Sequence, residues 1–230
     1  MAKELIIGID DAGRGPLIGP MILAGVLLTK EQEKALKEAG VKDSKMLAHS
    51  SRVKLAKTIK ENCLDSKIIR AFPNEIDSAV FSKVNLNTLE AKKTAEVINA
   101  LNQSKFQKEK IKVVVDCPSV NIKAWKATLS KFVKHMDNLE INCEHKADVN
   151  WPAVSSASIL AKVAREDEVE KLKKEYGDFG SGYPADPITK SFLLKYGKKL
   201  ENSGIFRKSW QTWKSIFPGK SQSSLLDFKK

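Results

Sequence analysis

The chain has 230 residues and carries 40 Lys and Arg against 28 Asp and Glu, a formal net charge of +12. A chain of this length can bury a sizeable core, and so basic a balance favours a polyanion such as nucleic acid as the partner. Its three cysteines are odd in number and lack metal-type spacing, which argues against a disulfide framework or a zinc site. The sequence shows no secretory signal and no apolar run as long as a membrane span, so we expect a cytoplasmic protein with no membrane partner.

The apolar pattern predicts strands over residues 5–10, 21–28, 67–71, 111–116 and 139–143. Helical patterns cover residues 31–39, 51–61, 87–101, 122–133, 152–175 and 186–200. A short glycine- and proline-containing turn joins the first two strands, so we expect them to pair antiparallel, whereas the later strands alternate with helices. The predicted fold class is therefore α/β, with a mixed five-stranded sheet flanked by helices.

The segment GIDDAGRGP, residues 8–16, places two adjacent carboxylates, Asp10 and Asp11, where an apolar strand meets a glycine-flanked turn. Carboxylate oxygens suit hard divalent cations, and glycines leave the backbone open to a substrate. Asp116 ends another apolar strand, and ligands of open α/β sheets gather beyond strand ends. An aspartate that only caps the following turn would give the same pattern.

Another acidic pair, Glu166 and Asp167, lies in a helix whose first half is apolar nearly all round. Periodicity does not choose between the two acids, and both could be ordinary surface residues. If one of them meets Asp10, Asp11 and Asp116, four carboxylates repel one another strongly, and two divalent cations would relieve that repulsion. Two such ions could bind the attacking water and the leaving 3′-oxygen of a phosphodiester, so the pattern favours metal-dependent hydrolysis of a nucleic acid backbone.

Five ordered blocks resemble ribonuclease HII, the type 2 ribonuclease H, in its archaeal form. GIDDAGRGP is similar to that family's GIDEAGRGP, and the other blocks are VKDSKML (41–47), HKADVNWPAVSSASILAKVARE (145–166), GSGYPADPIT (180–189) and FRKSWQT (206–212). The resemblance implies a ribonuclease H-like catalytic core over residues 1–200, a C-terminal helical extension over 201–218 and a flexible tail over 219–230. The implied activity uses Mg²⁺ or Mn²⁺ to hydrolyse the RNA strand of RNA–DNA hybrids and to cut 5′ of ribonucleotides embedded in duplex DNA, leaving a 3′-hydroxyl.

By this resemblance the family's four metal-binding acids correspond to Asp10, Asp11, Asp116 and Glu166, because the fourth acid follows an arginine that here is Arg165. The family usually has Glu at the position of Asp11 and Asp at that of Glu166, so the two side-chain lengths are exchanged. If both approach one ion from opposite sides, the exchange is compensatory, and Asp11→Glu alone should impair cleavage unless Glu166→Asp is added.

Substrate recognition is also implied by the resemblance. Gly13, Arg14 and Gly15 resemble a segment whose peptide groups bind the 2′-hydroxyl, the group that distinguishes RNA from DNA, although a tight turn alone would also explain the glycines. Tyr183 resembles a tyrosine that stacks on the deoxyribose next to the ribonucleotide. Arg14, Lys45 and Lys146 are candidate phosphate contacts, and a solvated surface charge is the alternative for each.

The last residues of the chain carry a possible partner signal. Gln222, Leu225 and Phe228 have the Q-x-x-L-x-x-F order of peptides that bind sliding clamps, and a tail without a partner is the alternative.

Two other functions of the whole chain stay open, a noncatalytic homologue that binds RNA–DNA hybrids and another nuclease on the same fold, such as a junction resolvase. The resemblance to the archaeal form, in which a single chain suffices for activity, predicts a monomer.

Overall fold

A computed structural model describes residues 4–41 and 48–218 of the chain. The strands are β1 (Leu5–Ala12), β2 (Met21–Thr29), β3 (Asp65–Ala71), β4 (Ile111–Asp116) and β5 (Leu139–Glu144). The helices are α1 (Lys30–Glu38), α2 (His49–Asn62), α3 (Pro73–Phe81), α4 (Leu86–Leu101), the short 3-10 turn η2 (Ser104–Phe106), α5 (Ile122–Ser130), α6 (Ala147–Asn150), α7 (Pro152–Tyr176), α8 (Pro187–Tyr196) and α9 (Gln211–Ile216).

The strands form one sheet in the order β3-β2-β1-β4-β5. β1 pairs antiparallel with β2, as the short turn between them predicted, and parallel with β4, while β5 runs parallel to β4. Because β1 and β4 are parallel neighbours, their carboxyl ends lie side by side at one edge of the sheet. The predicted mixed five-stranded sheet is confirmed.

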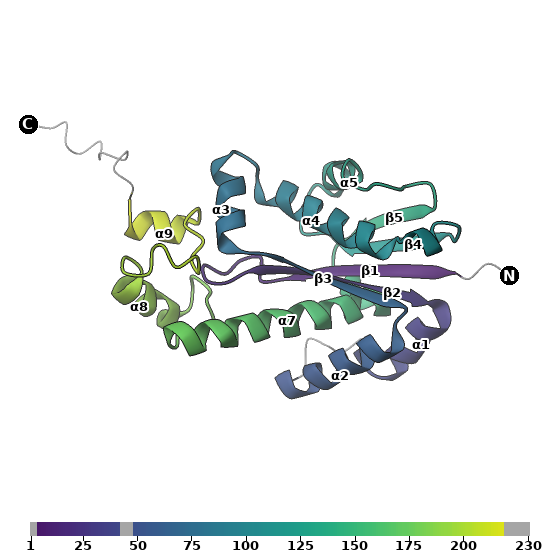
Figure 1. Ribbon diagram of the computed structural model, residues 1–230, viewed down its shortest axis with the longest axis horizontal. Coiled ribbons are helices and arrows are strands. Elements are labelled where there is room, and N and C mark those ends of the chain that lie inside the picture. Colours follow the sequence, from purple (N-terminus) through teal and green to yellow (C-terminus); the bar gives the residue numbers. More distant parts are fainter. Residues whose placement is uncertain (1–3, 42–47, 219–230) are drawn as a thin grey trace, which may run out of the picture.

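Helices cover both faces of this sheet (Figure 1). Successive side chains of a strand point to opposite faces, and on β1 the residues Leu5, Ile7 and Ile9 pack in one apolar cluster with α4 and α5. Ile6 and Ala12 pack in a second cluster with α1, α2 and α7 on the other face. The alternation along β1 therefore decides which helix layer each of its side chains meets.

Gly8 lets α7 lie directly against β1. A Cβ built at this residue would be 2.1 Å from the carbonyl carbon of Ala153 and 2.4 Å from the amide nitrogen of Val154. Both atoms belong to the first turn of α7, which starts with Pro152, a residue suited to the first helical position. The start of α7 is thereby fixed beside the middle of β1.

The C-terminal helices pack at the end of the sheet where β1 ends (Figure 1). An apolar cluster joins Leu17 and Ile18, which follow β1, to the C-terminal part of the chain. Its other members include Phe192 of α8, Phe206 in the loop before α9, and Trp213 of α9. This cluster crosses the predicted boundary at residue 200, so the last described part of the chain packs closely on the loop that follows β1.

The predicted elements agree with the structure except at some ends and in three short helices. The helix predicted to run to residue 200 ends at Tyr196, and the one predicted to run to residue 133 ends at Ser130. The sequence did not predict α3, α6 or η2, and α6 and η2, with four and three residues, are too short to show a clear period. Over the ranges that the structure describes, no helix has the length and apolar character needed to cross a bilayer.

Candidate active site

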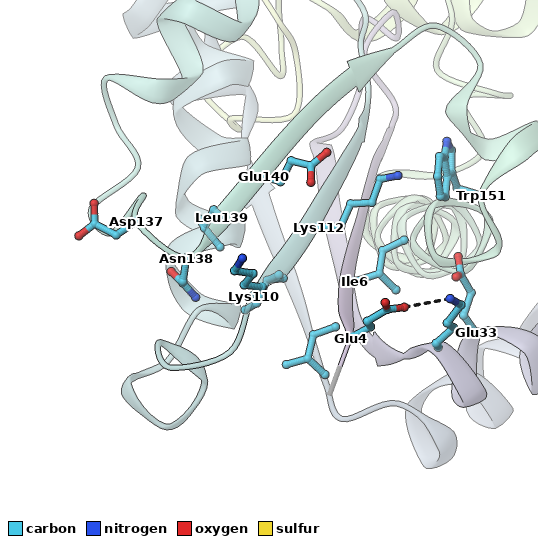
Figure 2. A pocket seen from close by; sticks show the side chains of 13 residues that line it. Glu4, Ile6, Glu33, Lys110, Lys112, Asp137, Asn138, Leu139, Glu140 and Trp151 are labelled. Carbon is cyan, nitrogen blue, oxygen red and sulfur yellow. Dashed lines mark hydrogen bonds and ion pairs between the residues drawn. The ribbon is translucent and has the colours of Figure 1, made fainter. Parts of the chain in front are cut away.

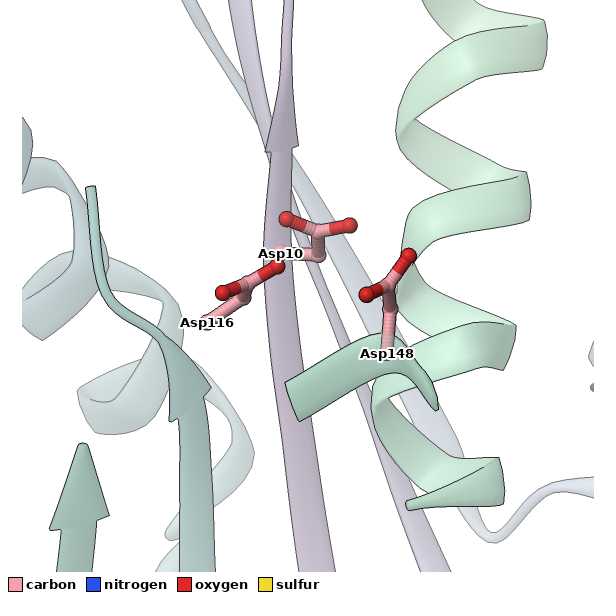
Figure 3. A group of neighbouring side chains, drawn as sticks. All are labelled: Asp10, Asp116 and Asp148. Atoms are coloured by element: carbon pink, nitrogen blue, oxygen red, sulfur yellow. The ribbon is translucent and has the colours of Figure 1, made fainter. Parts of the chain in front are cut away.

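Three carboxylates from three elements point toward one another at the carboxyl edge of the sheet (Figure 3). They are Asp10 of β1, Asp116 at the end of β4 and Asp148 of α6, and one oxygen atom of each lies within 4.8 Å of the others. The pairing of Ile9 with Val115 sets Asp10 and Asp116 at the same level of neighbouring strands. We call Asp10, Asp116 and Asp148 the acid group.

The charged form of Asp10 is disfavoured in this position. Asp10 is only 9% exposed, and burial, followed by the negative charges of Asp11 and Asp116, raises its pKa to about 8. Carboxylate oxygens gathered in this way are the donors that Mg²⁺ and Mn²⁺ prefer. The donor set therefore fits a hard divalent ion.

Asp11 lies on the other face of β1, toward α4. Burial and then the charge of Glu90, a residue of α4 that is 1% exposed, raise the pKa of Asp11 to about 8. Arg14 contacts the same helix, because its Nε lies 3.0 Å from Oε2 of Glu90 and its Nη2 lies 2.5 Å from Oδ1 of Asn87. The guanidinium of Arg14, for which a phosphate contact was predicted, thus binds α4.

Glu166 is not brought to the acid group. Its carboxylate binds Arg52, and Nδ1 of His49 lies 2.5 Å from Oε2, so it joins α7 to α2. Ser158, which faces Asp10, lies on the same helix eight residues earlier, and that separation corresponds to about 12 Å along the helix axis. The structure therefore places Asp148, and not Glu166, beside Asp10 and Asp116.

A cleft of about 310 Å³ lies beside Asp11, the residue that follows Asp10 on β1. Its lining consists of Asp11, Ala12, Gly13, Arg14, Gly15, Lys162, Arg165, Glu166 and Tyr183. The Tyr183 ring lies against Gly15, where an added Cβ would be 3.4 Å from the ring, and the guanidinium of Arg165 lies 5.1 Å from the ring centre. The glycine-rich loop and Tyr183 that were predicted to recognise substrate do share one cleft.

Gly13 requires its glycine for two reasons. Its φ is +80°, a value that disfavours other residues, and an added Cβ would lie 2.7 Å from Cδ of Arg165 and 2.9 Å from the carbonyl oxygen of Pro20. Glycine at this position therefore lets Arg165 and the backbone of Pro20 pack closely against the loop.

Sequence reasoning missed two basic residues of the cleft, Lys162 and Arg165. Their spacing of three residues on a helix puts them on one face. Because both lie in the block 145–166 that resembles the family, this spacing could have identified them as candidate phosphate contacts. Lys146 is exposed and adopts a left-handed conformation with φ of 57° directly before α6. Lys45 and the tail residues Gln222, Leu225 and Phe228 lie outside the described residues.

A larger hollow of about 620 Å³ lies at the opposite end of the sheet (Figure 2). Its walls include the first residues of three strands, Leu5, Ile111 and Leu139, together with Trp151 and charged residues of both signs. Lys112 lies 4.1 Å from the centre of the Trp151 ring. The acid group is at the other ends of these strands, so this hollow is separate from the candidate site.

A mixed sheet that presents clustered carboxylates at the ends of its central strands, beside a cleft of bare backbone and basic side chains, defines a metal-dependent nuclease of the ribonuclease H-like class. Comparison with known proteins specifies the family. The family model for ribonuclease HII matches residues 7–213, and ribonuclease HII of Pyrococcus furiosus is 42% identical over 228 residues, which cover 97% of each chain. The chain belongs to the ribonuclease HII family and is an endoribonuclease.

Two solved structures agree with this assignment. The crystal structure of the ribonuclease H2 from Pyrococcus horikoshii OT3 superposes with a TM-score of 0.82 at 37% identity, covering 92% of this chain and 96% of that one. A chain in the structure of the PCNA:RNase HII complex from Archaeoglobus fulgidus superposes with a TM-score of 0.78 at 35% identity, covering 97% of this chain and 100% of that one.

Proposed function

We propose that the chain hydrolyses the RNA strand of RNA–DNA hybrids and cuts duplex DNA on the 5′ side of an embedded ribonucleotide, leaving a 3′-hydroxyl. The observation that carries this proposal is the position of Asp10 and Asp11. The two residues are adjacent on β1, where Asp10 belongs to the acid group and Asp11 lines the cleft beside the glycine-containing loop. A scissile phosphate beside the acids can therefore have its neighbouring sugar in the cleft.

Asp10, Asp116 and Asp148 would hold Mg²⁺ or Mn²⁺, and Asp11 is the adjacent carboxylate available to a second ion. Bound there, the metal supplies Lewis acidity at the phosphate and lowers the pKa of the attacking water. Lys162 and Arg165 neutralise substrate phosphates without reading sequence. Glu166 holds α2 beside the cleft through Arg52 and His49.

Selection of a ribonucleotide falls to the glycine loop and Tyr183. Backbone N–H groups of residues 13–15 can donate to a 2′-hydroxyl, which a deoxyribose lacks. The Tyr183 ring, 41% exposed and fixed between Gly15 and Arg165, offers a flat surface to the next sugar. Both elements recognise the sugar, so cleavage should not depend on base sequence.

The proposal is tested with a labelled duplex that contains one ribonucleotide, incubated with and without Mg²⁺ or Mn²⁺, beside an all-DNA duplex of the same sequence. We expect metal-dependent cleavage 5′ of the ribonucleotide and none of the all-DNA duplex. Tight binding without cleavage would instead support a noncatalytic hybrid-binding homologue. Equal cutting of the all-DNA duplex would support another nuclease on this fold.

We also propose that the chain acts as a cytoplasmic monomer and binds a sliding clamp through Gln222, Leu225 and Phe228. The support is the motif itself together with the related Archaeoglobus fulgidus protein, whose structure is that of a complex with PCNA. Truncation before Ser221 should abolish clamp binding in a pull-down while cleavage of the short duplex continues. The double substitution L225A/F228A keeps the length of the tail and should also abolish clamp binding. Clamp binding by either variant would refute the tail's role.

A further inference from the structure

The C-terminal segment Arg207–Trp210 contacts the glycine loop on the side away from the cleft. Arg207 is 0% exposed, and it donates from Nη2 to the carbonyl oxygen of Gly13 at 2.6 Å and from Nη1 to that of Arg14 at 2.8 Å. Nε1 of Trp210 donates to the carbonyl oxygen of Gly15 at 3.1 Å. Each of the three loop carbonyls therefore accepts a hydrogen bond from this one segment.

These bonds determine where the loop N–H groups point. In a planar trans peptide the C=O of one residue and the N–H of the next point in opposite directions. Fixing the carbonyls of Gly13 and Arg14 toward Arg207 therefore directs the N–H groups of Arg14 and Gly15 away from it. The same loop residues line the cleft, and Arg207 does not.

The segment is itself held firmly. The carboxylate of Asp77 in α3 accepts hydrogen bonds from the backbone N–H of Lys208 at 2.7 Å and from the N–H and hydroxyl of Ser209 at 2.8 Å and 2.6 Å. The guanidinium of Arg207 lies 5.0 Å from the centre of the Trp210 ring, so the two donors pack on each other. Hydrogen bonds to a buried carboxylate are among the stronger ones in proteins.

Keeping Arg207 in this place has a cost. Burial, followed by the charge of Arg165, lowers the pKa of Arg207 to about 9, since a buried cation is disfavoured unless it is well bonded. Two further bonds of 3.0 Å, from Nε and Nη2 to the carbonyl oxygen of Gly19, complete its partners. All four bonds go to the backbone of the segment that forms the loop and its return to β2.

We propose that Arg207 and Trp210 are positioning residues for ribonucleotide recognition, which hold the loop carbonyls so that the N–H groups of Arg14 and Gly15 face the substrate's 2′-hydroxyl. This inference rests on the proposed function. It makes the C-terminal segment part of the apparatus that discriminates RNA from DNA, while the acid group is independent of it.

The test compares variants on two duplexes that differ only in one sugar, ribonucleotide or 2′-deoxy-2′-fluoro. Trp210→Phe removes the Nε1 donor and keeps an aromatic ring, Arg207→Met removes the fork of donors, and Arg207→Lys keeps the charge. Asn102→Ala is the control, because Asn102 is a buried residue at the far end of the sheet, bonded to His135 and Asn138. For each variant we measure kcat/KM on both duplexes, the Mn²⁺ affinity and the unfolding midpoint in urea.

We expect Trp210→Phe to lower kcat/KM on the ribonucleotide duplex by about 2- to 13-fold, the equivalent of one hydrogen bond. Arg207→Met should lower it by at least about 100-fold, and Arg207→Lys should restore part of the loss. The rate on the fluoro duplex and the Mn²⁺ affinity should not change. The inference is overturned if Trp210→Phe leaves the ratio of kcat/KM between the two duplexes unchanged, whether both values stay the same or both fall equally. This outcome is decisive even if Arg207→Met does not fold. Failure of the unaltered chain to cut the ribonucleotide duplex would refute the proposed function instead.

Discussion

Replacing Gly8 with alanine tests how closely α7 must approach the sheet for the acid group to form. The added Cβ would lie 2.1 Å from the carbonyl carbon of Ala153 and 2.4 Å from both the carbonyl oxygen of Ala153 and the nitrogen of Val154. These are backbone atoms, so no side-chain rotation relieves the overlap. Overpacking of a core costs about 1–3 kcal/mol, and we expect Gly8→Ala to cost more than about 3 kcal/mol because a whole helix must move.

Gly25→Ala in the neighbouring strand is the matched control. Gly25 pairs with Ile9 across the β1–β2 ladder, and its Cβ would lie 2.4 Å from Cγ1 of Val97 and 2.9 Å from Cδ1 of Leu101. These atoms are the ends of side chains and can turn aside, so we expect a loss of about 1–3 kcal/mol. The gain from replacing glycine in a strand, about 0.5–1 kcal/mol, applies to both variants and cancels in the comparison.

Equilibrium unfolding in urea measures both free energies. Gly8→Ala should be the less stable variant, and its folded fraction should bind Mn²⁺ more weakly than the unaltered chain, because α7 follows directly after the short helix that carries Asp148. Gly25→Ala should bind Mn²⁺ normally. The reasoning is refuted if Gly8→Ala is as stable as the unaltered chain, or more stable than Gly25→Ala.

Two further predictions concern the charges and the cleft. The pKa of Asp10 and that of Asp11 are raised to about 8, against about 3.9 in an unfolded chain. Between these two pH values the folded metal-free chain binds more protons than the unfolded chain. Its free energy of unfolding therefore falls as the pH rises. Urea unfolding from pH 5 to 8 should show this fall, less steep in Asp10→Asn, and an identical slope in both proteins would contradict it. Tyr183→Ala should lower cleavage at a single ribonucleotide by at least about 10-fold, the equivalent of a lost base-sized stacking contact, without changing Mn²⁺ affinity, and equal cleavage by both proteins would exclude the role of the ring.

The sheet could be predicted because its signals are local. Apolar runs bounded by turns marked every strand, and two of these runs ended in Asp10 and Asp116, which the parallel pairing of β1 and β4 then placed together. The separation of Asp10 from Asp11 was also accessible, since adjacent residues of a strand point to opposite faces. Applied to β1, that period of two is enough to assign the two carboxylates to different faces of the sheet.

Asp148 and Glu166 show what the sequence could not give. Asp148 lies in the four-residue helix α6, with no apolar strand leading to it, and its place depends on the contact between Gly8 and the start of α7. Glu166 follows an arginine in a matched block, but its position along α7 and its bonds to Arg52 and His49 depend on how α2 packs on α7. Such long-range packing leaves no period in a single sequence.

The central claim, that Asp148 and not Glu166 completes the metal-binding acids, is tested most directly by calorimetric titration of Mn²⁺ into Asp148→Asn and Glu166→Gln. Both substitutions remove one negative charge and keep the shape of the side chain. We predict that Asp148→Asn weakens Mn²⁺ binding by at least about 10-fold, whereas Glu166→Gln binds Mn²⁺ within about 2-fold of the unaltered chain, a difference of less than about 0.5 kcal/mol. Normal binding by Asp148→Asn together with weakened binding by Glu166→Gln would contradict the account.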